Sequence, residues 1–291
     1  MRIEANHVTQ LYKENKALDD VSFTIEPHKI IGLLGRNGAG KTTLMNQLSG
    51  QLLPTKGTIR VNGEPTFDNR KTVQSICFIK EADNYKPNFK IQEVLQLGSL
   101  FYPNWNQPLA EELVKSFNLD RTMRVKALSK GMVSALGVIV GVSSRSPITI
   151  FDEPYTGMDA AARQELYTLL IEEYDEFPRT FIISTHLVDE ISNLFEKVMI
   201  LKEGKLIVYD DAETLRGSGY MVSGPKGIMD QFCMGKNVLH VDTFNNIQTA
   251  TFYESNLSSK EATTLGLTVS PLSMQELLVH LTKRTVKEAV K

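Results

Sequence analysis

The chain has few cysteines, no long apolar run and no excess of charge of either sign, and each shortage excludes a class of protein. Cys77 and Cys233 are the only cysteines, too few for a disulfide framework and too far apart for a CxxC metal or redox pair, so a reducing cytosol fits best. The longest apolar stretch, residues 135–142, is far shorter than the roughly 18 residues that a spanning helix needs. We expect a chain that does not cross a membrane alone.

The charge balance gives no sign of a nucleic-acid partner. Lys and Arg number 32 against 34 Asp and Glu, and 42% of the 291 residues are apolar, as in an ordinary globular protein. This length suggests roughly two domains with a full hydrophobic core. Residues 1–6 carry Glu4 and Asn6 where a signal peptide needs its apolar stretch, so we expect no secretion signal.

Short β-type runs alternate with helical segments through the first two thirds of the chain. This alternation is typical of an α/β fold with a parallel sheet. The pattern predicts strands at residues 21–25, 30–34, 57–61, 148–151, 180–184 and 198–201. Apolar residues at three- and four-residue spacing predict helices at residues 41–52, 91–100, 109–117, 160–174 and 187–195, with the region 85–145 mostly helical.

The texture of the chain changes after Gly204. Ser273 and Glu276 stand in capping-box spacing ahead of a segment with one apolar face, which predicts the start of a helix. The other elements expected here are loop-rich stretches at residues 216–219 and 223–225 and short strands near residues 238–241 and 249–253. We therefore predict a first domain over residues 1–209 and a smaller one over residues 210–291.

A phosphate-binding motif lies at residues 35–42, Gly-Arg-Asn-Gly-Ala-Gly-Lys-Thr. It matches the P-loop pattern G-x-x-x-x-G-K-[ST], follows the apolar run 30–34 and precedes a predicted helix, which is the context this motif requires. Its glycines let backbone N–H groups surround phosphate oxygens, Lys41 adds a positive charge, and Thr42 would ligate Mg²⁺. The alternative is a glycine-rich turn without a ligand, and the flanking strand and helix argue against it.

Two carboxylates end the predicted strand at residues 148–151. Asp152 is placed to hold Mg²⁺, and Glu153 could act as a general base toward an attacking water. A strand followed by Asp-Glu is, by itself, more often a solvated turn. The interpretation as a catalytic pair therefore depends on Lys41 and Thr42.

With both motifs placed, the chain resembles the ATP-binding subunits of ABC transporters over residues 1–215. The resemblance implies a P-loop NTPase fold of the ABC ATPase type, with a helical subdomain at about residues 85–145 and a small α+β accessory domain at the C-terminus. It implies hydrolysis of ATP at a head-to-tail dimer interface. It also implies separately encoded integral-membrane permease subunits, export as the favoured direction, and a place in the cytoplasm on the inner face of the membrane.

The resemblance assigns roles to individual residues. Residues 128–132, Leu-Ser-Lys-Gly-Met, occupy the place of the family's signature, and Asp159 falls in the loop near the dimer interface. Two of the residues that the resemblance assigns have a simpler interpretation as well. Tyr12 could be an ordinary core tyrosine, and His186 could be a polar loop residue without a role in catalysis. The implied ATP site comprises Tyr12, Asn37, Gly38, Ala39, Gly40, Lys41, Thr42 and Thr43, joined by Ser129 and Gly131 of the signature. The implied Mg²⁺ ligands are Thr42 and Asp152, and the implied catalytic residues are Lys41, Glu153 and His186.

Two departures from the family pattern stand out. Lys80 takes the place of a glutamine that holds the metal and the water, and a charged lysine has no lone pair to give, so Glu81 is the candidate substitute. Lys130 and Met132 replace the signature's usual glycine and glutamine. These changes put symmetric hydrolysis in doubt, and a homodimer and a heterodimer with a more typical subunit both stay open.

Residues 85–105 contain five aromatic side chains. In the resembling family this region receives a short helix of the membrane subunit, and aromatic anchors such as Tyr102 and Trp105 suit such a groove. The alternative is that the rings fill the core of the helical subdomain. Two other functions stay open at this point: a soluble ABC-type ATPase in translation or DNA repair, and a subunit that mainly binds ATP and regulates.

Overall fold

The computed structural model describes residues 1–253 and 259–283, which form two compact units. The first comprises Met1–His186 with Met199–Tyr209, and the second comprises Leu187–Val198 with the chain from Asp210 onward. Within the described ranges, no helix is both long enough and apolar enough to cross a membrane.

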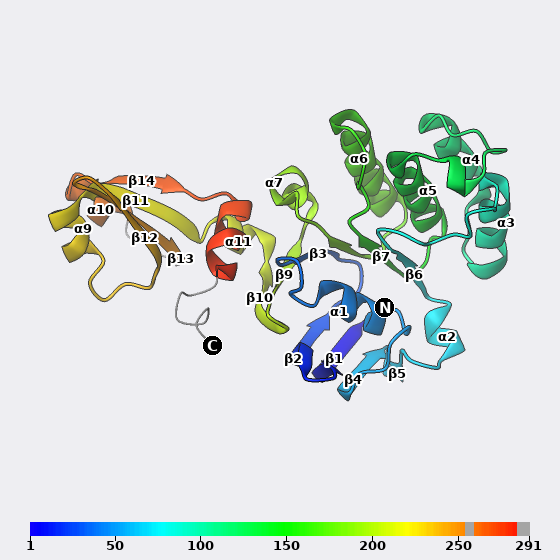
Figure 1. Cartoon of the computed structure of the whole chain (residues 1–291), viewed down its shortest axis with the longest axis horizontal. Coiled ribbons are helices and arrows are strands. Elements are labelled where there is room, and N and C mark those ends of the chain that lie inside the picture. The colour runs from blue at the N-terminus through cyan, green and yellow to red at the C-terminus, as the bar shows by residue number, and fades with distance from the viewer. Residues whose placement is uncertain (254–258, 284–291) are drawn as a thin grey trace. The chain divides into compact units, whose positions relative to one another are not determined.

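A six-stranded sheet forms the centre of the first unit (Figure 1). The strands β3, β8, β7 and β6 pair in parallel, and β3, β7 and β8 are buried throughout, as expected for strands covered on both faces. In spatial order the strands are β10 (Lys205–Asp211), β9 (Lys197–Lys202), β3 (Ile30–Leu34), β8 (Thr180–Ser184), β7 (Ile148–Asp152) and β6 (Ile76–Ile79).

A second, antiparallel sheet sandwiches helix α1 (Lys41–Leu48) against the parallel one. Leu44, Met45 and Leu48 of α1 belong to one buried cluster with apolar side chains from both sheets. The antiparallel strands, in spatial order, are β2 (Asn15–Ile25), β1 (Ile3–Tyr12), β4 (Lys56–Val61) and β5 (Glu64–Pro65), and the short helix α2 (Arg70–Val73) follows them. The P-loop motif runs directly into α1. Packing of α1 between the two sheets therefore fixes the position and orientation of the P-loop.

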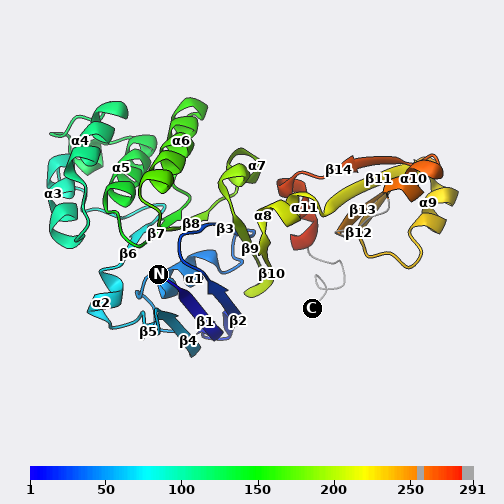
Figure 2. The ribbon, with the colours of Figure 1, turned by 180° about the vertical axis from the view of Figure 1, so that it is seen from behind.

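Four helices gather at one end of the first unit in both views (Figures 1 and 2). They are α3 (Ile91–Phe101), α4 (Gln107–Ser116), α5 (Lys130–Ser143) and α6 (Ala160–Glu176). Helix α5 contacts the other three as well as β6 and β7. Its glycines permit this close packing, because a Cβ at Gly141 would lie 2.5 Å from the ring of Phe151.

The second unit is built on an antiparallel sheet with the strand order β12-β13-β11-β14. Met229 and Phe232 of one helix cover a face of this sheet together with Ala262. The elements of this unit are α7 (Val188–Ile191), α8 (Ala212–Arg216), β11 (Gly219–Pro225), α9 (Lys226–Phe232), β12 (Val238–Phe244), β13 (Ile247–Tyr253), α10 (Ser259–Thr264), β14 (Thr268–Pro271) and α11 (Met274–Thr282). The predicted capping box is confirmed, since Ser273 and Glu276 exchange side-chain and backbone hydrogen bonds at the start of α11.

Two expectations about secondary structure are wrong. Gly219 and residues 223–225 do not lie in loops but in the strand β11, which pairs with both β13 and β14. Gly224 accommodates a neighbour there, because a Cβ would stand 2.3 Å from the Leu267 side chain. The helix expected over residues 41–52 ends at Leu48, since Gly50 takes a φ of 73° with Thr66 O 2.5 Å from where its Cβ would be.

Candidate active site

The carboxyl ends of three neighbouring strands define the candidate site. The P-loop motif follows β3, Asp152 ends β7, and Ser184 ends β8, which lies between those two strands. In the sheet register Ser184 stands opposite both Leu33 and Asp152. Ligands of parallel α/β sheets bind at this edge, so the structure collects the phosphate motif and the acidic pair where a ligand is expected.

The P-loop turns sharply into α1. Gly40 has a φ of 107°, and a Cβ there would lie 2.5 Å from the Ala17 carbonyl oxygen, so only glycine fits. Asn37 and Gly38 are exposed at the crown of the turn, Ala39 is buried, and the half-buried Thr43 lies in the first turn of α1. The loop therefore presents backbone N–H groups ahead of a helix start, as anion binding requires.

Lys41 is held in the loop by backbone carbonyls. Its Nζ donates to Gly35 O at 2.7 Å, a contact that a phosphate oxygen could replace. Burial lowers the pKa of Lys41, while the carboxylates of Glu153 and Asp152 act in the opposite direction. The predicted catalytic lysine therefore lies close enough to the acidic pair for their charges to attract each other.

Thr42 and Asp152 meet side by side. The Thr42 hydroxyl donates to Asp152 Oδ2 at 3.1 Å, and the other oxygen of Asp152 accepts from the Ser184 hydroxyl at 2.5 Å. Hydroxyl and carboxylate oxygens are the ligands Mg²⁺ prefers, and Mg²⁺ is usually held by one or two protein ligands together with phosphate oxygens and water. The two residues thus fit the metal. Within residues 1–253 and 259–283, no cluster of three or more His, Cys, Asp or Glu could hold an ion instead.

Glu153 joins His186 directly. The Nδ1 atom of His186 lies 2.7 Å from Glu153 Oε2, and since a carboxylate can only accept, Nδ1 carries a proton and donates it to this hydrogen bond. Glu153 has a φ of 50°, an unusual value for a non-glycine residue, and its N–H points at Ser184. The structure thus joins two residues 33 positions apart into one acid–base pair.

Three further residues of the site were not expected from the sequence: Tyr155, Ser184 and Thr185. The hydroxyl of Tyr155 donates to Glu153 and lies 2.6 Å from Thr185 Oγ1. Burial, followed by the charge of Glu153, raises the pKa of Tyr155, so this hydroxyl keeps its proton. The only available signal was position, since Ser184 ends β8, the strand next to β7, and Thr185 follows it.

The remaining predicted site residues lie on other elements. Tyr12 ends β1 with 48% of its surface exposed, so the core alternative is wrong for this ring. Ser129 caps α5 by accepting from Met132 N at 3.2 Å. Gly131 lies against the backbone of Gly157, whose oxygen is 2.5 Å from where a Cβ of residue 131 would be. Asp159 caps α6 through Ala162 N.

Lys80 continues from β6 beside Asp152, because Ile79 pairs with Phe151 in the sheet register. Asn84 exchanges two hydrogen bonds with the Lys80 backbone, and the ammonium lies 5.7 Å from the centre of the Phe78 ring. Glu81 is exposed and lines a cavity of about 450 Å³ together with Lys130 at the start of α5. Glu81, the residue after Lys80, and Lys130 of the signature therefore line the same cavity.

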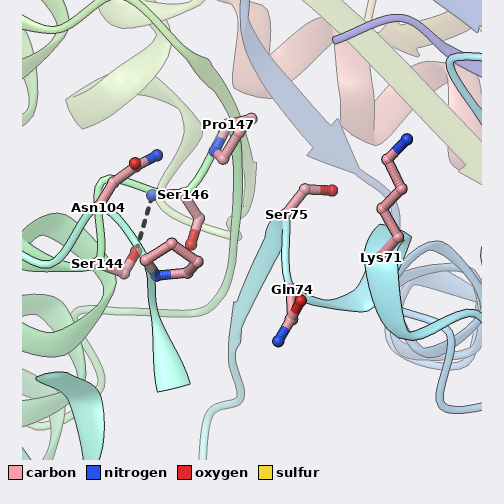
Figure 3. Close-up of a pocket in the computed structure, with 8 residues that line it drawn as sticks. Lys71, Gln74, Ser75, Asn104, Ser144, Ser146 and Pro147 are labelled. Atoms are coloured by element: carbon pink, nitrogen blue, oxygen red, sulfur yellow. Dashed lines mark hydrogen bonds between the residues drawn. The ribbon is translucent and has the colours of Figure 1, made fainter. Parts of the chain in front are cut away.

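A smaller pocket of about 190 Å³ lies at the opposite ends of β6 and β7 (Figure 3). Its lining includes Ser75 and Ser146, which precede these strands, together with Asn104. The P-loop and the acidic pair follow the carboxyl ends of the strands, so this pocket is not part of the candidate active site.

The aromatic groove expected over residues 85–105 needs correction. Tyr102 and Trp105 are not exposed anchors: both are half-buried, and the Trp105 ring covers Gly98, where a Cβ would lie 2.4 Å from it. The exposed apolar side chains are instead Leu100 and Phe101, at 74% and 66%. Phe101, one of the five aromatic residues counted, therefore forms an exposed apolar surface with Leu100 on the last turn of α3, whereas Tyr102 and Trp105 do not.

The geometry defines a P-loop nucleotide hydrolase, and comparison with known proteins narrows the class. A family model described as ABC transporter matches residues 18–156. The chain is 31% identical over 208 residues to the bacitracin transport ATP-binding protein BcrA of Bacillus licheniformis, covering 70% of this chain and 68% of that protein. It is 32% identical over 217 residues to the Nod factor export ATP-binding protein I of Paraburkholderia xenovorans, covering 70% and 69%.

The fold agrees with this relationship. A solved ATP-binding subunit of an ABC transporter superposes with a TM-score of 0.67 at 23% identity, covering 74% of this chain and 92% of the other. The chain belongs to the ABC transporter family as an ATP-binding subunit, and it is an ATPase of that family. A role in translation or DNA repair is not favoured.

Proposed function

We propose that this chain hydrolyses ATP as one half of a head-to-tail dimer and drives export through separately encoded integral-membrane subunits, from the cytoplasmic side of the membrane. The observation that carries the catalytic part is the meeting of Lys41, Thr42, Asp152, Glu153 and His186 at one edge of the sheet. Export rests on relatives such as the Nod factor export protein. No described feature calls for a nucleic-acid partner.

The residues divide the chemistry of hydrolysis between them. Lys41 and the P-loop N–H groups bind the β- and γ-phosphates and balance charge as the terminal P–O bond breaks. Glu153 accepts a proton from the attacking water, and His186, carrying a proton on each ring nitrogen, donates Nδ1–H to Glu153 and Nε2–H to a γ-phosphate oxygen. Mg²⁺ bound by Thr42 and Asp152 would neutralise phosphate charge.

The rest of the nucleotide site is assigned in the same way. Tyr12 stacks on the adenine through its exposed ring, and Asn37, Gly38, Ala39, Gly40 and Thr43 shape the phosphate loop. Ser129 and Gly131 contact the nucleotide of the opposite subunit at the start of α5. Since Lys80 and Lys130 replace neutral residues in this scheme, a heterodimer in which this chain contributes the weaker site is the arrangement we favour.

The Lys80 position gives a direct test of the weaker site. We expect Lys80→Gln to raise the basal ATPase rate or the Mg²⁺ affinity of the assembled complex, because the amide oxygen can accept where the ammonium cannot. Lys86→Gln is the matched control, since Lys86 also lies over a phenylalanine ring, at 5.8 Å. Phosphate release measured across a Mg²⁺ titration decides it, and identical curves for both variants would show that Lys80 does not face the nucleotide.

Coupling to the membrane gives a second test. We expect Leu100→Ser with Phe101→Ser to weaken association with the membrane protein that copurifies with the chain, by about 2 kcal/mol or more if these are anchor side chains. The melting temperature of the chain alone should stay within a degree or two, because both side chains are exposed.

Trp105→Ala supplies the contrast. Its ring packs on Gly98 and its Nε1 donates to Gln107 at 2.8 Å, so this variant should lose stability, on the order of 3 kcal/mol, without a specific loss of association. The reverse pattern, in which Trp105 governs association and the Leu100–Phe101 pair does not, would move the docking surface elsewhere. Turnover that is the same with and without the copurified partner would overturn coupling itself.

A further inference from the structure

Tyr155 occupies a buried position inside the candidate active site. It follows Glu153 by two residues and is only 3% exposed. Its ring meets the His186 ring edge-on, with the centroids 5.6 Å apart. A tyrosine used only to fill a core would keep its hydroxyl at the surface or bond it to any nearby carbonyl, whereas this hydroxyl is directed at the residues that carry the reaction.

Four polar groups face this hydroxyl, and the farthest of them, His186 Nδ1 at 3.5 Å, lies closer to Glu153 Oε2, at 2.7 Å. The backbone N–H of His186 reaches the hydroxyl at 3.0 Å and can only donate, and the Glu153 carboxylate can only accept. A phenolic hydroxyl has one proton and two acceptor positions. The Tyr155 proton therefore goes to Glu153 Oε2, and the Thr185 hydroxyl, at 2.6 Å, fills the second acceptor position as a donor.

One oxygen of Glu153 is fixed by this arrangement. Oε2 accepts from both Tyr155 and the Nδ1–H of His186. In the part of the chain that the structure describes, no hydrogen bond to Oε1 is found, and the Glu153 side chain keeps 13% of its surface exposed. The Glu153 carboxylate is thus held through Oε2, and Oε1 is left to accept a hydrogen bond from water.

We propose that Tyr155 is a positioning residue for ATP hydrolysis, which holds Glu153 by Oε2 and the His186 backbone by its N–H so that Oε1 faces the attacking water. This inference rests on the proposed function of Glu153. The residue acts through Glu153 and His186 and does not itself touch the nucleotide.

The test compares Tyr155→Phe with Tyr174→Phe. Phenylalanine keeps the ring contact with His186 and removes only the hydroxyl. Tyr174 is the matched control, because its hydroxyl donates to His28 O at 2.7 Å, away from the site. We expect kcat of the assembled complex to fall roughly 10- to 100-fold in Tyr155→Phe, as loss of a hydrogen bond to a charged group implies, with ATP affinity within about twofold of wild type. Tyr174→Phe should leave kcat unchanged.

A double-mutant cycle separates positioning from a structural role. In a Glu153→Gln background, Tyr155→Phe should change the single-turnover rate by less than about threefold, because the carboxylate it positions is gone. An equal loss in both backgrounds would overturn the inference, as would an unchanged kcat in Tyr155→Phe or a loss that follows ATP affinity. Should Tyr155→Phe fold poorly, Thr185→Val removes the neighbouring donor with little change of shape and should lower kcat in the same Glu153-dependent way.

The proposed function and this inference fail differently. If Glu153→Gln hydrolyses ATP at the wild-type rate, Glu153 is not the base and the proposed function of the site falls. If Glu153→Gln is inactive while Tyr155→Phe is fully active, only the role of Tyr155 falls.

Discussion

Replacing Glu153 with glutamine should lower ATP hydrolysis by roughly two to four powers of ten while ATP binding survives. The amide has nearly the size of the carboxylate but cannot take the proton of the attacking water. Lys41, Thr42 and the P-loop backbone are unchanged in this variant, so affinity for ATP should stay within a few fold. A dimer that persists in ATP should then accumulate, because its dissociation would require hydrolysis.

An assay of phosphate release measures the loss of turnover, and an ATP-binding assay measures the retained affinity. Size-exclusion chromatography in the presence of ATP detects the accumulated dimer. Glu112→Gln is a suitable control, since Glu112 is exposed on α4 and forms part of a different surface. Unchanged turnover in Glu153→Gln would remove Glu153 from the mechanism. Loss of ATP binding together with turnover would instead show that the carboxylate supports the fold of the loop.

The second large effect concerns stability at the C-terminal end of α6. Glu173 on α6 is 3% exposed and is shared by two arginines: Arg179 Nη1 lies 3.2 Å from one oxygen, and Arg145 Nη2 lies 2.9 Å from the other. Arg179 is itself 1% exposed and stacks on the Phe181 ring. Burial lowers the pKa of Arg179, and the charge of Glu173 opposes that shift.

Glu173→Ala should therefore cost about 3–5 kcal/mol, because it leaves the Arg179 charge buried without a counter-ion. Glu176→Ala is the matched control: Glu176 also pairs with Arg145 but is 69% exposed, so it should cost less than about 1 kcal/mol. Urea unfolding followed by tryptophan fluorescence measures both, since the single tryptophan, Trp105, lies in the first unit. Equal costs for the two variants would mean that the buried pair is solvated in solution.

The local patterns in the sequence predicted the core of the site and its placement at a sheet edge. The P-loop glycines, Lys41, Thr42 and the Asp152–Glu153 pair carry short-range signals, because phosphate binding needs them at fixed spacing. The strand at 180–184 was predicted with its bounds as observed. Tyr155 and Ser184 could not be assigned, since their roles arise only when β7 and β8 lie side by side.

Glycine and aromatic residues gave the misleading signals. Glycines at 219 and 224 indicated a loop, yet both lie in a central strand. Glycine is needed at these positions because Leu272 and Leu267 occupy the space that a side chain would fill. The aromatic count over residues 85–105 located a surface region, but it could not tell which rings turn inward. Burial of Trp105 depends on Gly98, a helix position that composition alone does not reveal.

The first turns of α5 contact the loop that follows Glu153 through a hydrogen bond and close backbone packing. The Ser134 hydroxyl donates to Thr156 O at 2.7 Å, and Gly131 rests directly on Gly157. In a head-to-tail dimer, the start of α5 would contact the nucleotide bound by the partner subunit. The loop that it packs on would lie next to Glu153, the base that acts on the chain's own nucleotide. Occupancy of one site then biases the geometry of the other, and by reciprocity the second biases the first to the same degree. The two ATP sites of the assembly would act as coupled switches even where only one of them turns over.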